Sequence, residues 1–523
     1  YARAMRRCVL TVGALVCAMG FTGAARVQAA ALRAAAPTTV AALPAGHQIA
    51  YLQLAAANPA ELQRLAAAHR IAAAERGRRL AAAQPTTATR TRVEQLAIAA
   101  GLHVMQSNRL SVAVEGTPAQ IRAFVGDRAA AARSRSAAIP TALKGLVSSI
   151  SGGNAPGLRL RPMAAPLQYA SPTFTDLTNR YAGVNGTPSG GTALTIATIQ
   201  LSGWNDFALT QFAATNRLPN PVASGQYTAV PVAPFSALDV ATPLGGGDQE
   251  VALDQEALLA AAPHANQRVY FAQNNLSGSF AAAVTQVASD AAAYHIVALS
   301  ISWGSCEANW GADMAGMHTA LIAAKAAGVT VFAASGDSGK YDCYDTHNSQ
   351  GDPPTDTDID VDYPASDPLV VAGGGTTVYT STETAWSDPQ LDRPWGSGGG
   401  VSTNWPAPSW QMGATGRRVP DIAANADAAS GPPVYLPNGQ AGFAWMSGGG
   451  TSIASPLMAA MFTNTLAQAG FTTGIGDIHT FLYQNPPTGS FADITVGGDN
   501  ATSGLSSSAW AADRKSTRLN SSH

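Results

Sequence analysis

The residue of this chain best suited to nucleophilic chemistry is Ser452, in the sequence Gly-Gly-Gly-Thr-Ser-Ile-Ala-Ser-Pro over 448–456. A glycine run followed by Thr-Ser and then Ser-Pro predicts a tight turn that opens a helix, with Ser452 in its first turn. The N-terminus of a helix offers unpaired N–H groups to developing negative charge. We therefore expect an exposed serine hydroxyl that attacks a carbonyl carbon.

Such a serine needs a base, and no histidine stands where a serine protease would need one. Subtilisins carry a His-Gly-Thr-His segment and an Asp-Ser/Thr-Gly segment after the first strand, and neither is in place here. Five scattered histidines are expected to be structural: His264, His295, His318, His347 and His479. The base must therefore be another kind of side chain.

Glu250 and Asp254 are the candidate base and its partner. They lie four residues apart in a helix predicted over 249–261, so they share one face. Two carboxylates this close share a proton and titrate as a unit. We predict that Glu250 takes the proton of Ser452, while Asp254 orients Glu250 and holds the shared proton. The open alternative is a solvated acidic helix face, which is what an isolated pair of this spacing usually indicates.

Asp337, in Ala-Ser-Gly-Asp-Ser-Gly over 334–339, ends a predicted buried strand. A subtilisin has an asparagine there that donates to the oxyanion, and only a protonated aspartate could donate in the same way. The residue types therefore predict activity in acid. Gly-Asp-Ser-Gly over 336–339 also matches the nucleophile motif of chymotrypsin-like proteases, but the histidine segment of those all-β enzymes is absent.

Seven motifs in a fixed order make residues 169–495 resemble the sedolisins, or serine-carboxyl peptidases. The motifs are Glu-Val-Ala-Leu-Asp (250–254), Ser-Ile-Ser-Trp-Gly (300–304), Ala-Ser-Gly-Asp-Ser-Gly (334–339), Tyr-Pro-Ala-Ser-Asp-Pro (363–368), Gly-Ser-Gly-Gly-Gly-Val-Ser (396–402), Arg-Val-Pro-Asp-Ile-Ala-Ala-Asn-Ala-Asp (418–427) and Gly-Gly-Thr-Ser-Ile-Ala-Ser-Pro (449–456). The resemblance implies a Ser-Glu-Asp triad of Ser452, Glu250 and Asp254, with Asp337 at the oxyanion. It implies an acid endopeptidase made as a zymogen, with a tripeptidyl-peptidase of the family or an inactive binding homologue as alternatives.

The resemblance also implies a substrate cleft and a calcium site. Six residues would line the cleft and pair with an extended peptide: Ser302, Trp303, Gly304, Ser397, Gly398 and Gly399. Trp303 could equally be ordinary core. One calcium ion would bind at Asp493 and Ile494, but the later Gly-x-Gly-x-Asp loop of the family is missing. Because calcium prefers six to eight oxygen ligands, half a site should bind poorly.

Alternating apolar strands and helices from Tyr169 onward predict an α/β fold with a parallel sheet covered by helices on both faces. The resemblance makes this a subtilisin-like fold. Strands are predicted over 192–201, 268–273, 295–304 and 329–337, with helices over 249–261 and 314–328. Gly304, Asp337 and the turn before Ser452 would then lie at the carboxyl ends of the strands, where the ligand site of such a sheet is found.

The chain divides into a signal peptide (5–30), a propeptide (47–127), a linker with the activation cut (128–167), a catalytic domain (168–512) and a tail that we interpret as foreign sequence (513–523). The propeptide is predicted as a small α+β, ferredoxin-like unit. Its elements would be a strand over 47–55, helices over 58–83 and 93–101, a hairpin over 102–116 and a helix over 117–126. In the family it blocks the cleft, so it is the expected intramolecular inhibitor.

The cysteine count and the net charge indicate the compartment of the protein and the kinds of partner it lacks. The four cysteines leave Cys306 and Cys343 after the signal peptide, so one disulfide is predicted for a secreted protein, with two free buried thiols as the alternative. Charged residues make up 12% and the net charge is −2, which points to no nucleic-acid or membrane partner. The resemblance implies protein and peptide substrates.

Overall fold

The fold is described from a computed structural model. It covers residues 43–68, 71–128, 138–153, 160–162, 172–181, 193–243, 246–273, 277–344, 355–378, 382–388, 395–411, 414–438, 442–484, 491–492, 494 and 516–517. The predicted signal peptide, Asp493 and most of the predicted foreign tail lie outside these residues.

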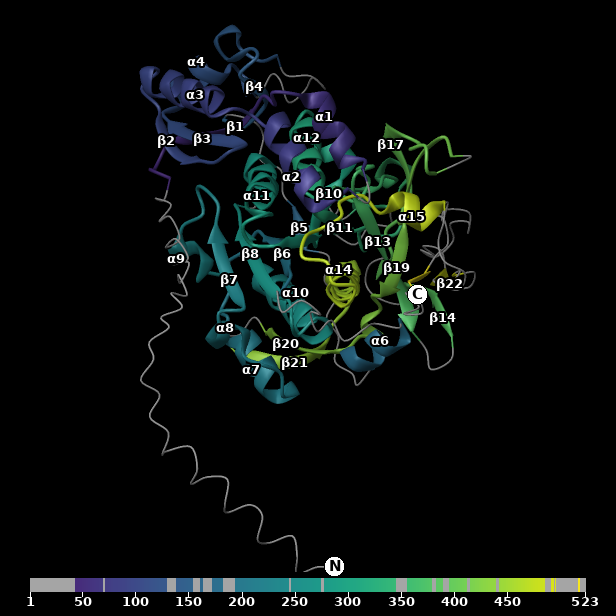
Figure 1. The fold of residues 1–523 in the computed structure, drawn as a ribbon. Coiled ribbons are helices and arrows are strands. Elements are labelled where there is room, and N and C mark those ends of the chain that lie inside the picture. The colour runs from purple at the N-terminus through teal and green to yellow at the C-terminus, as the bar shows by residue number, and fades with distance from the viewer. Residues whose placement is uncertain are drawn as a thin grey trace, which may run out of the picture. The chain divides into compact units, whose positions relative to one another are not determined.

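The larger part of the protein is built around a central sheet whose strands are mostly parallel (Figure 1). Seven neighbouring strands run parallel in the order β7 (Tyr227–Pro231), β8 (Asn266–Phe271), β6 (Thr195–Gln200), β9 (Ile296–Ile301), β11 (Thr330–Ala334), β13 (Val371–Val378) and β19 (Ile422–Asn425). Their short apolar segments alternate with helices, which is why parallel pairing is possible. The predicted subtilisin-like sheet is therefore confirmed.

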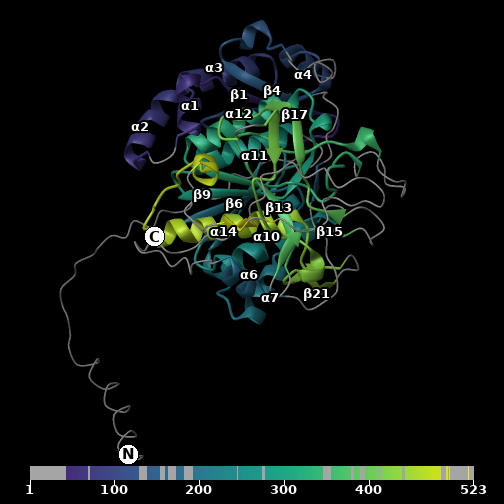
Figure 2. The same ribbon diagram turned by 90° about the vertical axis from the view of Figure 1, so that its right-hand side faces the viewer.

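Helices cover both faces of this sheet because successive strand residues point to opposite sides. On β6, Ala197 and Ile199 pack toward α11 (Ser277–Asp290) and α12 (Asp313–Ala326). Ile196 faces the other way, toward α14 (Thr451–Gln468) and the end of α10 (Gly247–Ala261). Figure 2 shows α14 and α10 side by side along the sheet. These two helices carry the serine and the carboxylate pair.

The remaining elements lie at the edges of the sheet and in its connections. The helices are α6 (Phe174–Arg180), α7 (Phe207–Asn216), α8 (Pro221–Ser224), α9 (Ala237–Val240) and α15 (His479–Tyr483). The strands are β5 (Arg161–Pro162), β10 (Trp303–Cys306), β12 (Asp362–Tyr363), β14 (Glu383–Ala385), β15 (Ser387–Asp388), β16 (Trp395–Gly396), β17 (Gly400–Pro406), β18 (Gly416–Val419), β20 (Pro433–Pro437), β21 (Phe443–Ser447), β22 (Phe491–Ala492) and β23 (Ser516–Thr517). β23 falls in the predicted foreign tail and pairs with β19.

Residues 48–152 form a four-stranded antiparallel sheet in the order β2-β3-β1-β4. Its elements are β1 (Gln48–Leu54), α1 (Pro59–Ala66), α2 (Ala73–Ala83), α3 (Thr87–Ala99), β2 (His103–Ser107), β3 (Ser111–Gly116), α4 (Pro118–Val125) and β4 (Val147–Gly152). This βαββαβ order is ferredoxin-like, as predicted. Thr117 caps α4 through a capping box with Gln120.

Two expectations for this N-terminal unit are wrong. Strand β4 lies in the segment predicted as linker, because its alternating Val147 and Ile150 complete the sheet beside β1. The segment 58–83, predicted as a single helix, forms two separate helices, α1 and α2.

Among the described residues, none of the helices combines the length and apolar character that a membrane span requires.

A buried ion pair joins β18 to the start of β19. The guanidinium of Arg417 donates to both oxygens of Asp421, at 2.6 and 2.5 Å, and both side chains have no exposed surface. Burial alone would raise the pKa of Asp421, but Arg417 and His479 outweigh it and hold that pKa well below its usual range. Tyr483 also donates to Asp421, at 2.6 Å. The pair is therefore ionised even in acid.

We expect Asp421→Asn to lower the free energy of unfolding by about 3 to 5 kcal/mol, because it leaves the Arg417 charge buried without its counter-ion. A lowered folded-state pKa gives stability that is present above the unfolded value and lost only as pH falls through the folded one. The loss should therefore be as large at about pH 5 as at about pH 7 in urea titrations. Asp290→Asn, which breaks the more exposed pair with Arg268, should cost less. An equal loss in the two variants would contradict the prediction.

Candidate active site

Ser452 lies in the first turn of α14, as its motif predicts. Gly450 caps the helix with a φ of 89°, a conformation that favours glycine. The expected exposure of the hydroxyl is wrong, because Ser452 has no exposed surface. Its Oγ has no hydrogen-bond partner among the described residues. The serine is therefore closed off from solvent in the chain that still carries its N-terminal unit.

Glu250 and Asp254 lie on α10, which packs against α14. The open alternative was a solvated acidic helix face, yet both carboxyl groups have no exposed surface. Gly247 allows the close packing at the start of this helix, since a Cβ there would lie 2.7 Å from Cβ of Ser202 and 3.0 Å from the Trp303 ring. Two buried carboxyl groups one helical turn apart are rare unless they have a function.

The hydrogen bonds around the pair show which carboxyl group carries the charge. Asp254 accepts from Nε2 of Gln200 at 2.7 Å and from Oγ of Ser302 at 2.8 Å. Neither oxygen of Glu250 accepts a hydrogen bond from the described residues. Bonds from donors favour the ionised form, so this arrangement favours the charge on Asp254 and the proton on Glu250. The sequence-based prediction placed the shared proton on Asp254.

The pKa shifts of the pair have the same physical cause. Burial raises the pKa of Glu250 well above its usual range, and the neighbouring Asp254 raises it further. The Ser452 hydroxyl is close enough to act in the opposite direction. Burial also raises the pKa of Asp254, while its bonds from Ser302 and Gln200 lower it. The two groups titrate as one unit, which the spacing predicted.

Gln200 is a positioning residue to which the sequence analysis gave no role. It ends β6, where its Nε2 holds Asp254 and its Oε1 accepts from Nε1 of Trp303 at 3.0 Å. Trp303 is therefore buried and orients Gln200, in addition to standing in the predicted cleft. The signal available in the sequence was a glutamine at the end of an apolar predicted strand.

Asp337 follows β11 and lies beside the start of the serine helix. Its Oδ1 accepts from the backbone N–H of Thr451 at 2.7 Å and from the Thr451 hydroxyl at 2.8 Å. Thr451 is the residue before the nucleophile, so this contact holds the aspartate next to Ser452. The sequence reasoning gave Thr451 no role of its own.

Segment 396–399 holds residues 336–339, the loop that contains Asp337, through backbone hydrogen bonds. Gly396 and Gly398 donate their N–H groups to the carbonyls of Asp337, at 2.9 Å, and Gly336, at 2.7 Å, while Gly399 donates to Gly339 at 3.3 Å. The Ser397 hydroxyl is buried and accepts from N–H of Gly375 in β13 at 2.8 Å. The N–H groups of Gly398 and Gly399, predicted to pair with substrate, are therefore already bonded here.

The predicted substrate strand β10 has a segment of the same chain on it. Trp303 pairs with Pro162 and Gly304 with Arg161, so β5 runs antiparallel along its edge. On its other edge, β10 pairs with β12. The added strand that was predicted for a bound peptide is thus formed by residues between the N-terminal unit and the catalytic part.

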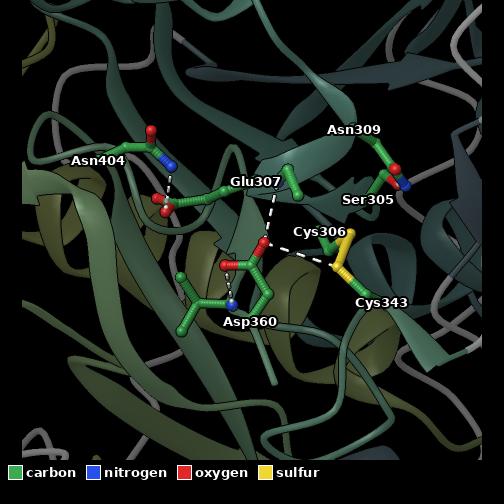
Figure 3. Close-up of a disulfide and its surroundings, with 9 residues drawn as sticks. Ser305, Cys306, Glu307, Asn309, Cys343, Asp360 and Asn404 are labelled. Carbon is green, nitrogen blue, oxygen red and sulfur yellow. Dashed lines mark hydrogen bonds between the residues drawn. A yellow bond between two sulfur atoms is a disulfide. The ribbon is translucent and has the colours of Figure 1, made fainter. Parts of the chain in front are cut away.

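A disulfide joins Cys306, at the end of β10, to Cys343 in the loop after Asp337 (Figure 3). Oδ2 of Asp360 lies 3.6 Å from the sulfur of Cys343 and accepts from N–H of Ala308 at 2.9 Å. The bridge therefore connects the predicted substrate strand to the loop that follows Asp337.

The donors for calcium are not assembled within the described residues. Asp493 lies outside them, and Ile494 is buried. The one close group of acidic and sulfur atoms in the described part consists of Cys306, Cys343 and Asp360. Because two of these form a disulfide and only one is a carboxylate, this group does not suit calcium.

Known proteins share both sequence and fold with this chain, although no protein-family model matches it. Kumamolisin of Bacillus sp. (strain MN-32) is 35% identical over 412 residues, which are 72% of this chain and 67% of kumamolisin. Sedolisin of Pseudomonas sp. (strain 101) is 35% identical over 232 residues, 41% of this chain and 38% of sedolisin. The solved structure of Pseudomonas sedolisin, a serine-carboxyl proteinase complexed with two molecules of pseudo-iodotyrostatin, has a TM-score of 0.55 at 24% identity, covering 68% of this chain and 96% of that one.

Proposed function

Because this chain belongs to the sedolisin family of serine-carboxyl peptidases and is a serine-type endopeptidase, we propose that Ser452 is its nucleophile, Glu250 its general base and Asp337 the group that binds the oxyanion. The observation that carries the proposal is the buried Glu250–Asp254 pair on α10 beside α14. None of the described histidines hydrogen-bonds to Ser452. Peptides or proteins are the substrates of this enzyme class.

In the proposed reaction, Oγ of Ser452 bonds to the peptide carbonyl carbon while its proton passes to Glu250. The carbonyl oxygen becomes an oxyanion and accepts a hydrogen bond from protonated Asp337. The C–N bond breaks as Glu250 returns the proton to the leaving amine. Water then hydrolyses the acyl-enzyme by the reverse sequence of proton transfers. Asp254 holds the shared proton of the pair while Glu250 is ionised, and it orients Glu250 for both proton transfers.

The protonation states required by this mechanism favour acid. Asp337 must be neutral to donate, while the Glu250–Asp254 pair must keep a single negative charge. The hydrogen bonds of the closed chain favour the proton of that pair on Glu250, so this proton must pass to Asp254 before Glu250 can act as a base. Opening the site to water lowers the pKa of a buried carboxyl group. Activation is therefore expected to require opening as well as acid.

We include the zymogen in the proposal: residues 48–152 act as the propeptide, and the chain is cut between 157 and 171. Two observations support it. Ser452 is inaccessible to solvent, and Arg161–Pro162 occupies the edge of β10. An exposed connection between two packed units is a favoured site of cleavage.

The experiment that tests the proposal is incubation of the full chain at about pH 4 and about pH 7.5, with Ser452→Ala beside it. We expect self-cleavage between 157 and 171, and peptidase activity, only in acid and only with Ser452 present. Mass spectrometry of the products gives the cut. Cleavage by the Ser452→Ala chain, or an optimum near neutrality, would show that another group acts. A folded and cut chain with no activity would favour a binding role.

Two further parts of the proposal concern the export of the protein and the binding of calcium. The Cys306–Cys343 disulfide and the signal-like residues 5–30 support export. Calcium would bind at Asp493 and Ile494 only with further oxygen ligands from residues outside the described ranges. A thermal unfolding midpoint that rises with calcium in the wild type, and not in Asp493→Asn, would support the metal site.

A further inference from the structure

The N-terminal unit packs on the catalytic part through one face of its sheet. Ala50 and Leu52 of β1 pack inside the unit, whereas Ile49 and Tyr51 join the core formed by α11 and α12. Tyr51 donates its hydroxyl hydrogen to the carbonyl of Ala233 at 2.9 Å. These contacts involve no charged side chain and consist of apolar packing with a hydrogen bond, as in an ordinary protein–protein interface.

A second and separate contact is made by the helix pair α1–α2. Leu62, Leu65 and Ala66 of α1 and Ala83 of α2 form an apolar cluster with Ala326 at the end of α12. This cluster is small, so its apolar area alone cannot give strong binding. A polar contact lies beside it, and that contact has an unusual composition.

Arg76 of α2 is 4% exposed, and its guanidinium faces only backbone carbonyls. Within the unit it donates to the carbonyls of Leu65, at 3.1 Å, and Ala68, at 3.0 Å. Across the interface it donates to Lys325 at 3.4 Å, Ala326 at 3.3 Å and Ile475 at 2.9 Å, again to carbonyls. Within the described residues no carboxylate forms an ion pair with it.

These acceptors are the ends of two helices. The carbonyls of the last turn of a helix lack partners within the helix and carry partial negative charge. Leu65 belongs to the last turn of α1, and Lys325 and Ala326 to the last turn of α12. One buried guanidinium therefore caps the C-terminus of a helix on each side of the interface. Its planar set of five donors suits this role, which a lysine cannot fill equally well.

We propose that Arg76 is the anchor that holds the N-terminal unit on the catalytic part after the chain is cut. The carbonyls of Lys325, Ala326 and Ile475 form a guanidinium-binding site at the end of α12. Its occupant is the chain's own N-terminal unit, first as part of the chain and then as a bound fragment. That the docked N-terminal unit inhibits the enzyme rests on the proposed function, whereas the docking through Arg76 does not.

The test uses the full chain with Ser452→Ala and with the recognition sequence of an unrelated, specific protease placed within 163–171. That protease cuts the chain, and the dissociation rate of the two fragments is measured by dilution and size-exclusion chromatography. Arg76→Ala should speed dissociation by about 30-fold or more, since truncating a buried charged donor acts mainly on the dissociation rate. Arg76→Lys should give an intermediate rate. Arg78→Ala, an exposed arginine on the same helix, should stay within about twofold.

An Arg76→Ala complex that dissociates at the wild-type rate would overturn the proposal. Hydrogen exchange of β1 and β3 in the uncut chain checks whether the N-terminal unit still folds. If Arg76→Ala unfolds it, Arg76→Lys decides: faster dissociation supports the anchor, and the wild-type rate refutes it. Because an external protease makes the cut in a Ser452→Ala chain, the result is independent of whether Ser452 is the nucleophile.

Discussion

Replacing Glu250 by glutamine is expected to lower kcat/KM for a peptide by about 10⁴-fold or more, with the chain still folded. The amide cannot accept the proton of Ser452, and no described histidine is bonded to that serine to take over. The matched control is Glu256→Gln. Glu256 is a second fully buried glutamate on α10, but it accepts from N–H of Tyr435 instead of facing the serine. A loss of the same size in both variants would mean that the effect is structural.

Glu250→Gln should also change how the free energy of unfolding depends on pH. Burial raises the folded-state pKa of Glu250 above its unfolded value of about 4.3, so the folded chain keeps a proton that the unfolded chain has lost. The free energy of unfolding must then fall as pH rises from that unfolded value toward the folded one. Glutamine does not titrate and removes this loss. In a Ser452→Ala background, Glu250→Gln should therefore gain stability relative to its parent at neutral pH and not in strong acid. An unchanged pH dependence would contradict the raised pKa.

Replacing Asp337 by alanine is expected to lower kcat by about 10²- to 10³-fold with little change in KM, since it removes one donor to the oxyanion. Its Oδ1 is held by the N–H and hydroxyl of Thr451, which leaves Oδ2 to carry the proton. The measurement is steady-state kinetics of the cut enzyme across the acid range.

Asp337→Asn is the companion variant, because an amide donates without being protonated. It should retain more activity than Asp337→Ala, and its activity should extend to higher pH than that of the wild type. If the asparagine variant folds but loses as much activity as alanine, a neutral donor at this position is not what the reaction needs. If alanine loses only a few-fold, Asp337 does not bind the oxyanion.

Short-range patterns in the sequence were enough for the strands and helices of the catalytic part. Apolar segments such as 195–200 and 330–334 lie between helices, and that alternation predicts parallel strands with the site at their carboxyl ends. Motif order and the absence of a suitable histidine led to Glu250 and Ser452. Each of these inferences depends on residues near one another in the chain, or on residue type alone. Cysteine parity predicted the Cys306–Cys343 bridge in the same way.

Tertiary structure decided what depends on partners distant in sequence. Val147–Gly152 reads as linker until β1, nearly a hundred residues earlier, is beside it. The carboxylates of helix α10 could have faced solvent, and packing against α14, β20, α7 and α6 is what buries most of the helix. Which carboxyl group of the pair holds the proton depends on Gln200 and Ser302, each about fifty residues from Asp254. Hydrogen bonds and burial set protonation, and both arise only when the whole chain has folded.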